Sequence, residues 1–230
     1  QSDLLTCVSE DAIGEYIFEK LKEFNVGSNF CRRVENKFQT QVAVVETILK
    51  NNQSILYRNN SCDLQLNKND IDNINFQDYS AVFISGTTLS SNPSRDAVFY
   101  ATQKASLLSI PLIIDMDYRP YNWESDEIKS NIYKKIMNEM DIIIGNDLEF
   151  NIADNSTEGF QLAKSFINEK PSIIIYKMGE KGSTVITKEK EQNFGIFKVE
   201  AIKPTGAGDA FNGGFILSLI HISEPTRRPK

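Results

Sequence analysis

Four short apolar runs rich in β-branched residues recur along the middle of the chain. They begin at residues 81, 111, 142 and 172, so successive starts lie 30, 31 and 30 residues apart. Continuous apolar runs of this kind are typical of strands buried on both faces of a parallel sheet. The segments between them, 94–108, 125–140 and 157–168, have helical length and spacing, with Ser125 and Thr157 as expected N-caps. The pattern predicts an α/β fold in which βαβ units build a mostly parallel central sheet flanked by helices.

The pattern differs toward the N-terminus. A strand is expected at residues 4–8 and a helix at 11–25, with Gly27 as its stop signal. Between about residues 32 and 66 the chain alternates between apolar and polar positions, which indicates strands rather than helices. Two further strand pairs are expected: 41–49 with 54–58, as a small antiparallel insertion, and 184–187 with 194–199.

The bulk composition allows one α/β domain. The chain has 230 residues, of which 40% are hydrophobic and 24% charged, ordinary values for a globular protein. The net charge of −6 argues against nucleic acid or an anionic membrane as the main partner. No apolar run of about 18 residues and no secretory signal are present, so we expect no membrane partner and a cytoplasmic location. The three cysteines form no CxxC pair and are expected to be free thiols.

The two ends of the sequence depart from this pattern. The chain opens without a methionine inside an expected strand, and residues 217–230 resemble a translated sequencing-adapter oligonucleotide. We expect this tail to interrupt the helix that residue 216 has begun, because its prolines cannot continue one. The functional domain is therefore expected to span residues 1–216, and His221, the only histidine, is left out of the chemistry.

A glycine-rich segment before an apolar helical stretch is the strongest chemical signal. Its sequence is Thr205-Gly206-Ala207-Gly208-Asp209. Small residues let backbone amides approach an anion, and a helix N-terminus adds partial positive charge there. Asp209 is placed to accept a hydroxyl proton while the amides steady a transferring phosphoryl group. The alternative is a glycine turn in which Asp209 only caps the helix.

Two motifs follow the third and fourth apolar runs, at the edge where ligands bind in open α/β sheets. Asn146 and Glu149 come after the third run, and Lys177, Gly179 and Gly182 come after the fourth. For the first motif the alternative is a helix cap with an acidic first turn. For the second motif the alternative is a plain β-turn with flexible glycines.

The segment Asp115–Trp123 follows the second apolar run, again at the ligand edge. It carries Arg119, whose forked guanidinium suits carboxylates and phosphates. The alternative for Arg119 is a surface ion pair, and Pro120 and Trp123 are expected to pack rather than to contact a ligand.

Together these motifs resemble those of the ribokinase-like, or pfkB, carbohydrate kinases over about residues 1–216. The resemblance implies a ribokinase-like fold with a small inserted β lid at about residues 32–66, and ATP and Mg²⁺ as cofactors. It implies that Asp209 is the catalytic base and that the backbone amides of Gly206, Ala207 and Gly208 form an anion hole.

The resemblance also assigns the ATP side of the site. It implies that Asn146 and Glu149 position the triphosphate, with Glu149 holding Mg²⁺ through water. Lys177, Gly179 and Gly182 correspond to the family's ATP-side loop.

The segment 115–123 resembles that of family members that act on keto-sugar acids. The resemblance therefore implies phosphorylation of 5-dehydro-2-deoxy-D-gluconate on a primary hydroxyl, a step of inositol catabolism, with Arg119 contacting its carboxylate or the phosphates. Tyr57 and Arg58 lie in the lid and become candidate substrate contacts, with exposed strand residues as the alternative. The lid is also a candidate surface for a homo-oligomer.

Other functions stay open. One is the same chemistry on 2-keto-3-deoxygluconate or fructose, and another is a non-catalytic sugar or nucleotide sensor on the same fold. The resemblance further implies that an N-terminal sugar-binding segment and a C-terminal adenine-binding segment lie outside this sequence. We therefore expect the chain as given to be inactive.

Overall fold

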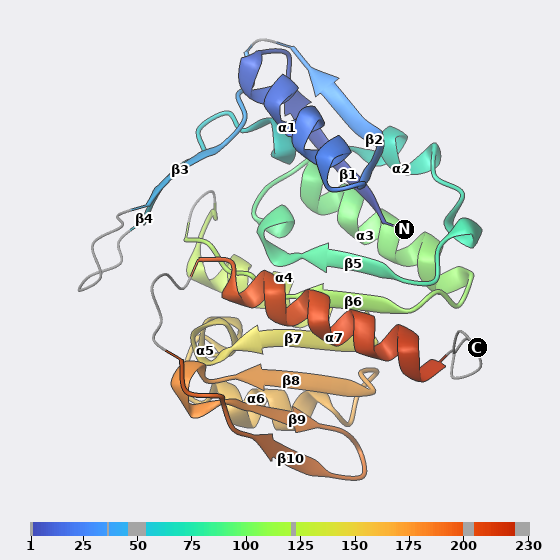
Figure 1. Cartoon of the computed structure of the whole chain (residues 1–230). Coiled ribbons are helices and arrows are strands. Elements are labelled where there is room, and N and C mark those ends of the chain that lie inside the picture. Colours follow the sequence, from blue (N-terminus) through green and yellow to red (C-terminus); the bar gives the residue numbers. More distant parts are fainter. Residues whose placement is uncertain (1, 36, 46–53, 121–122, 200–204, 224–230) are drawn as a thin grey trace. The chain divides into compact units, whose positions relative to one another are not determined.

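The computed structural model describes residues 2–35, 37–45, 54–120, 123–199 and 205–223 (Figure 1). The chain divides into two compact units, each described by itself. The larger unit contains residues 1–44 and 55–196, and the smaller contains residues 45–54 and 197–230.

A six-stranded sheet organises the larger unit, with strand order β10-β9-β8-β7-β6-β5 (Figure 1). Its strands are β5 (Val82–Ser85), β6 (Leu112–Asp115), β7 (Ile142–Asn146), β8 (Ile173–Lys177), β9 (Ser183–Ile186) and β10 (Glu191–Phe194). Strands β5 to β8 pair in parallel, and β9 and β10 add on antiparallel. The predicted mostly parallel α/β sheet is confirmed, and its four parallel strands start within one residue of the predicted positions.

The buried apolar runs fix the register of the parallel strands. Ile114 pairs with Ile143 and Ile143 with Ile174, and all three side chains are fully buried. Isoleucine has a high preference for such positions because its branched side chain packs well on a pleated surface. Burial on both faces is what the continuous, rather than alternating, apolar runs predicted.

Four helices connect the parallel strands: α3 (Ser94–Leu107), α4 (Asp126–Met137), α5 (Asp147–Asp154) and α6 (Gly159–Phe166). Strands β5 to β8 are adjacent in chain order, so right-handed connections place every connecting helix on the same face of the sheet. Figure 1 shows these helices behind the sheet. Because β5 to β8 run parallel, the loops that follow these strands lie together at one edge of the sheet.

One predicted N-cap is confirmed and one is wrong. The Ser125 hydroxyl accepts the Ile128 N–H at 3.1 Å, as expected for the start of α4. Thr157 does not cap α6, because the helix begins at Gly159 with Glu158 in the cap position. The start is set by packing: the Gly159 N–H donates to the Asn151 side chain of α5 at 2.9 Å, and a side chain at Gly159 would collide with the Asn151 backbone.

A second, two-stranded parallel sheet is formed by β1 (Asp3–Ser9) and β2 (Gly27–Val34), joined by α1 (Ala12–Glu23). The predicted first strand and helix are confirmed. Gly27 is not the helix stop, since it belongs to β2. Asn25 takes the left-handed conformation after the helix, with φ 55°, a conformation that asparagine tolerates better than most residues.

The inserted strands are β3 (Val42–Val45) and β4 (Ser54–Tyr57), which pair with each other. Residues 46–49, which the sequence assigned to the first of these strands, lie outside the described residues. Apolar side chains on these strands are exposed: Val42, Val44, Ile55 and Tyr57. Short helical turns follow at η1 (Cys62–Gln65), α2 (Lys68–Asp72) and η2 (Phe76–Asp78).

The second predicted strand pair needs a correction. The partner of β9 is Glu191–Phe194 rather than 194–199, and residues 195–199 are not in a strand. The Thr184 hydroxyl donates to the Asn193 side chain at 2.6 Å, which helps to fix this earlier register.

The smaller unit contains α7 (Ala207–Ser223). The expected interruption after Ile216 is not observed, because the apolar residues up to Ser223 continue the helix and the first proline, Pro225, lies outside the described residues. Among the described helices, none is long and apolar enough to cross a bilayer.

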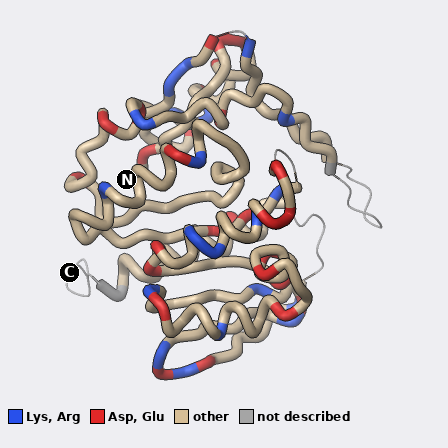
Figure 2. The backbone as a smooth tube through the Cα atoms, turned by 180° about the vertical axis from the view of Figure 1, so that it is seen from behind, with Lys and Arg blue, Asp and Glu red and all other residues tan. Residues whose placement is uncertain are grey.

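Charged residues of both signs are mixed along the helices and loops (Figure 2). The three cysteines are free, as predicted, with Cys7 and Cys62 buried and Cys31 partly exposed. Burial raises the pKa of the Cys7 thiol to about 12, so this thiol stays protonated near neutral pH.

Candidate active site

The four parallel strands all end in a polar residue at the same edge of the sheet. These residues are Ser85, Asp115, Asn146 and Lys177. Ser85 pairs with Asp115 across β5 and β6, and Asn146 pairs with Lys177 across β7 and β8. The carboxyl edge of a parallel sheet is where open α/β proteins bind ligands. The strand ends therefore form a polar row at the expected ligand edge.

Asn146 and Glu149 form a reciprocal cap at the start of α5. The Asn146 side chain accepts the Glu149 N–H at 2.9 Å, and the Glu149 carboxylate accepts the Asn146 N–H at 2.7 Å. The helix-cap alternative for this motif is thus present in the structure. A cap does not exclude a ligand role, because each carboxylate oxygen has a further lone pair.

Glu149 is buried, with 6% of its surface exposed. Its second oxygen accepts the Tyr118 N–H at 3.2 Å, a contact across 31 residues of sequence. Burial raises the pKa of the Glu149 carboxyl, while the hydrogen bond from the Asn146 N–H opposes that shift. Glu149 therefore joins the turn after β7 to the loop after β6.

Lys177 and Asp115 form an ion pair between the ends of β8 and β6. The Lys177 Nζ lies 3.4 Å from Asp115 Oδ1, and both side chains are largely buried. The positive charge of Lys177 also lowers the pKa of Glu149, although burial has the larger effect. The Lys177 ammonium group is thus paired with Asp115 at the ligand edge and close enough to Glu149 to affect its pKa.

The loop after β8 is a tight turn that requires glycine. Gly179 and Gly182 have φ values of 56° and 89°, and a side chain at Gly182 would overlap the Phe194 carbonyl oxygen. The Met178 N–H donates to the Gly182 carbonyl at 2.8 Å. The turn geometry explains both glycines, and an ATP-side role for them stays a prediction.

Arg119 lies in the loop after β6, and its side chain is 48% exposed. Its Nη2 is 2.8 Å from Asp117 Oδ1, and its Nη1 donates to the Tyr118 carbonyl at 2.8 Å. Asp117 has φ 33° and also accepts the Ser85 hydroxyl at 2.8 Å. The guanidinium is therefore held in one orientation while half of the side chain faces solvent.

The aromatic part of this loop packs as expected. The Trp123 ring lies 5.5 Å from the Tyr133 ring, and its Nε1 donates to the Arg119 carbonyl at 3.1 Å. The Tyr133 hydroxyl donates to the Met116 carbonyl at 2.9 Å. These contacts hold the loop against the core. Tyr121 and Asn122 lie outside the described residues.

The two predicted lid contacts have different surroundings. Tyr57 is 60% exposed, whereas Arg58 is 3% exposed. The Arg58 Nη2 donates to Asp63 at 2.6 Å and to the Thr87 carbonyl, in the turn η3 (Gly86–Leu89), at 3.1 Å. Arg58 is therefore not an exposed strand residue, and its guanidinium binds groups of this chain. A contact with substrate stays a prediction for both residues.

The glycine-rich segment belongs to the smaller unit. Gly206 has φ 86°, and α7 begins at the next residue with the Ala210 N–H donating to the Gly206 carbonyl at 2.9 Å. Asp209 is exposed in the first turn of the helix. The amides of Ala207, Gly208 and Asp209 occupy the first turn, where backbone N–H groups lack intrahelical acceptors.

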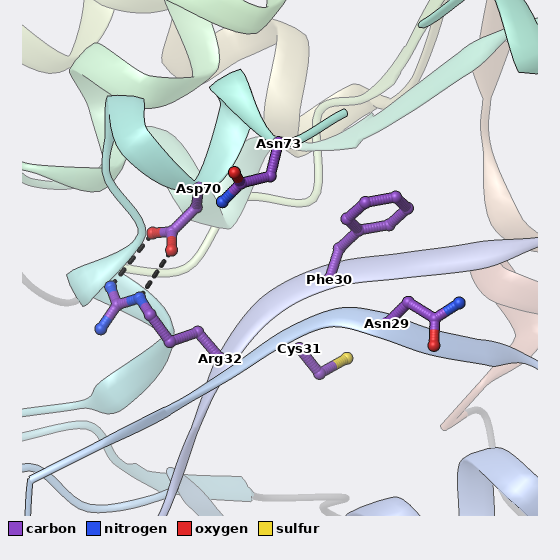
Figure 3. A pocket seen from close by; sticks show the side chains of 6 residues that line it. All are labelled: Asn29, Phe30, Cys31, Arg32, Asp70 and Asn73. Atoms are coloured by element: carbon purple, nitrogen blue, oxygen red, sulfur yellow. Dashed lines mark hydrogen bonds and ion pairs between the residues drawn. The ribbon is translucent and has the colours of Figure 1, made fainter. Parts of the chain in front are cut away.

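A separate hollow of about 200 Å³ lies between β2 and α2 (Figure 3). Arg32 in this hollow pairs with Asp70 at 2.6 Å and donates to the Gln65 carbonyl at 2.7 Å. None of the predicted site residues lines it. We interpret this ion pair as a link between the two elements.

The pfkB family carbohydrate kinase profile matches residues 1–227. The chain belongs to the pfkB family of carbohydrate kinases. It is 33% identical over 224 residues to a 5-dehydro-2-deoxygluconokinase of Photobacterium profundum, and 33% identical over 220 residues to one of Geobacillus kaustophilus. These matches cover 95% and 93% of the chain but 68% and 66% of the relatives, so the chain spans about two thirds of their length.

Solved structures of other kinases have the same fold. A fructokinase of Vibrio cholerae, with fructose, ADP and calcium bound, superposes with a TM-score of 0.82 at 20% identity, covering 94% of this chain and 70% of that one. An Escherichia coli protein described as a candidate ribokinase II, in complex with ATP and Mg²⁺, gives a TM-score of 0.81 at 20% identity, covering 93% and 68%. The ribokinase-like fold predicted from the motifs is confirmed.

In this pfkB chain the described residues contain no cluster of three His, Cys, Asp or Glu side chains able to hold a metal ion. Mg²⁺ commonly keeps several waters and binds proteins through one or two carboxylates plus substrate phosphates. Glu149 has free lone pairs for such a water, and Lys177 and Asn146 lie on the neighbouring strands.

Sequence reasoning missed three contacts of the site in this pfkB kinase: Glu149 with Tyr118, Lys177 with Asp115, and Asp117 with Ser85. One signal could have pointed to two of these pairs. Ser85, Asp115 and Lys177 each end an apolar run with a polar residue, and such strand ends meet at one edge.

Proposed function

We propose that the protein transfers the γ-phosphate of ATP to a primary hydroxyl of 5-dehydro-2-deoxy-D-gluconate, a step of inositol catabolism. The observation that carries this proposal is the 33% identity, over 95% of the chain, to a relative named 5-dehydro-2-deoxygluconokinase. The fixed, half-exposed guanidinium of Arg119 supports an acidic substrate, because an arginine fork can bind a carboxylate through two parallel hydrogen bonds.

Asp209 is the proposed base. It accepts the proton of the attacking hydroxyl, and its exposure in the first turn of α7 leaves the carboxylate free to do so. The amides of Gly206, Ala207 and Gly208 form the proposed anion hole, where the helix N-terminus stabilises negative charge that develops on the phosphoryl group. The positive φ of Gly206 supports this role, because it turns the chain into the helix without a side chain.

The edge formed by β7 and β8 is the proposed nucleotide side. Asn146 and Lys177 are held there by the strand register, and the turn with Gly179 and Gly182 lies directly after β8. Glu149 would hold Mg²⁺ through water. When bound, Mg²⁺ neutralises charge on the phosphates and helps to align them for in-line transfer.

The loop after β6 and the lid strands are the proposed sugar side. Arg119 binds the substrate carboxylate, and Tyr57 offers an exposed ring to cover the sugar. Arg58 supports the lid through Asp63 and the Thr87 carbonyl, and we place it next to the substrate with Tyr57. The exposed apolar side chains of the lid strands also support pairing of two copies through the lid.

The replacement Asp209→Asn, made in the full-length protein, tests the proposed base. It keeps the size and the helix-capping ability of the side chain but removes a usable proton acceptor. We expect turnover to fall by about 10³-fold or more, with ATP affinity little changed, since the loss of a general base falls on the chemical step. ADP release and ATP binding by calorimetry are the two measurements. Near-normal turnover would remove Asp209 from this role.

One alternative substrate is favoured by a specific observation. Fructokinases are among the solved structures that superpose well, one of them with fructose bound at a TM-score of 0.82. Fructose has no carboxylate, so a fructokinase would gain little from Arg119. Replacement of Arg119 by glutamine separates the two: a keto-acid kinase loses kcat/KM for its substrate, while a fructokinase keeps it.

A further inference from the structure

The buried Glu149 carboxylate holds two different segments at once. One oxygen accepts the Asn146 N–H of its own helix cap at 2.7 Å, and the other accepts the Tyr118 N–H of the loop after β6 at 3.2 Å. The residue is only 6% exposed. A buried carboxylate needs such partners, because an unsatisfied one is costly to keep out of water.

The Tyr118 amide lies directly between the two residues that form the arginine clamp. Asp117 precedes it and binds Arg119 at 2.8 Å, and the Arg119 Nη1 returns to the Tyr118 carbonyl at 2.8 Å. The Asp117 side chain is itself anchored to Ser85 on β5. The clamp is thus fixed through Ser85 on one side and through Glu149 on the other.

We propose that Glu149 is a positioning residue for Arg119, because its hold on the Tyr118 amide fixes the loop that presents the guanidinium to the substrate carboxylate. This inference rests on the proposed function and deepens it. Glu149 then serves both sides of the reaction: it caps the helix of the nucleotide side and orients the arginine of the sugar side. Loss of the carboxylate weakens sugar-acid binding even when no metal or nucleotide is present.

The replacement Glu149→Gln isolates the second contact. A glutamine has one acceptor oxygen, and glutamine serves as well as glutamate in a capping box. Its NH₂ group donates and cannot accept the Tyr118 N–H. Its single oxygen can accept only one of the two N–H groups, and we expect it to keep the shorter cap bond to the Asn146 N–H and to lose the bond from the Tyr118 N–H. Asp147→Asn is the matched control, because Asp147 starts the same helix but is exposed, and its carboxylate accepts the adjacent Leu148 N–H.

The first measurement is hydrogen exchange of the Tyr118 amide in protein free of ligand and metal. We expect exchange about tenfold faster in Glu149→Gln than in the wild type or Asp147→Asn, because one charge-assisted hydrogen bond is lost. Exchange that is unchanged in Glu149→Gln overturns the proposal. If that variant fails to fold, the wild type decides: a Tyr118 amide without protection also overturns it.

The second measurement is calorimetric binding of 5-dehydro-2-deoxygluconate without Mg²⁺ or ATP. We expect Glu149→Gln to raise the dissociation constant by about five- to tenfold, with Asp147→Asn unchanged, since a loosened loop must be ordered on binding. If Glu149 acts only through metal-bound water, this metal-free affinity does not change, and the proposal fails. A wild type that does not bind the acid contradicts the proposed substrate, while the exchange result still decides whether Glu149 holds the loop.

Discussion

Functional side chains are largely buried at the ligand edge of the sheet but exposed on the lid strands. At the edge, Asp115, Glu149 and Lys177 are buried or nearly so and bound to one another or to backbone groups. On the lid strands, Val44 and Tyr57 are more than half exposed. The edge is therefore organised before a ligand binds, as electrostatic catalysis requires. The lid keeps apolar surface that a sugar or a second copy can cover.

The largest expected difference in stability is between two neighbouring residues of the lid, one buried and one exposed. Arg58→Ala should lower the free energy of unfolding by about 3 kcal/mol, because it leaves Asp63 without its buried partner. Tyr57→Ala should change it by less than about 0.5 kcal/mol, since the ring is largely exposed. Urea unfolding of both variants measures the difference. Equal effects would mean that the lid is not anchored through Arg58.

A smaller effect is expected for two glycines near the edge. A methyl group at Gly86 would overlap the Met116 carbonyl oxygen, which also accepts the Tyr133 hydroxyl. Gly86→Ala should therefore cost about 2 kcal/mol through overpacking. Gly179→Ala meets no atom within 4 Å and should cost only about 1 kcal/mol, for its left-handed backbone. Thermal unfolding monitored by circular dichroism ranks the two, and a reversed order would contradict the packing at Gly86.

Most of the sheet could be predicted from the sequence because its strands are buried on both faces and need continuous apolar runs. The contacts of the site could not be predicted in the same way. Glu149 and Tyr118 are 31 residues apart, and Lys177 and Asp115 are 62 apart, so only the packed sheet brings them together. The error at Thr157 has a similar origin, because packing of Gly159 against Asn151 of α5 sets the start of α6. The error at Gly27 is local, because Asn25 already takes the left-handed conformation after the helix.

The smallest expected change in the free energy of unfolding comes from the two predicted helix caps. Ser125→Ala should cost about 1 kcal/mol, because its hydroxyl accepts the Ile128 N–H at 3.1 Å. Thr157→Ala should be nearly neutral, since Thr157 is exposed and Glu158 holds the cap position of α6. Chemical denaturation of the pair is the measurement. A loss at Thr157 as large as that at Ser125 would restore the cap that the sequence predicted.

The most direct test of the proposed activity is ADP release by the purified full-length protein with ATP, Mg²⁺ and a panel of sugars. We expect 5-dehydro-2-deoxygluconate to give a kcat/KM at least about 100-fold above that of fructose, because a site built to bind a carboxylate strongly rejects an analogue without one. A preference for fructose would contradict the role of Arg119. ATP binding without ADP release for any sugar would favour a non-catalytic sensor on the same fold.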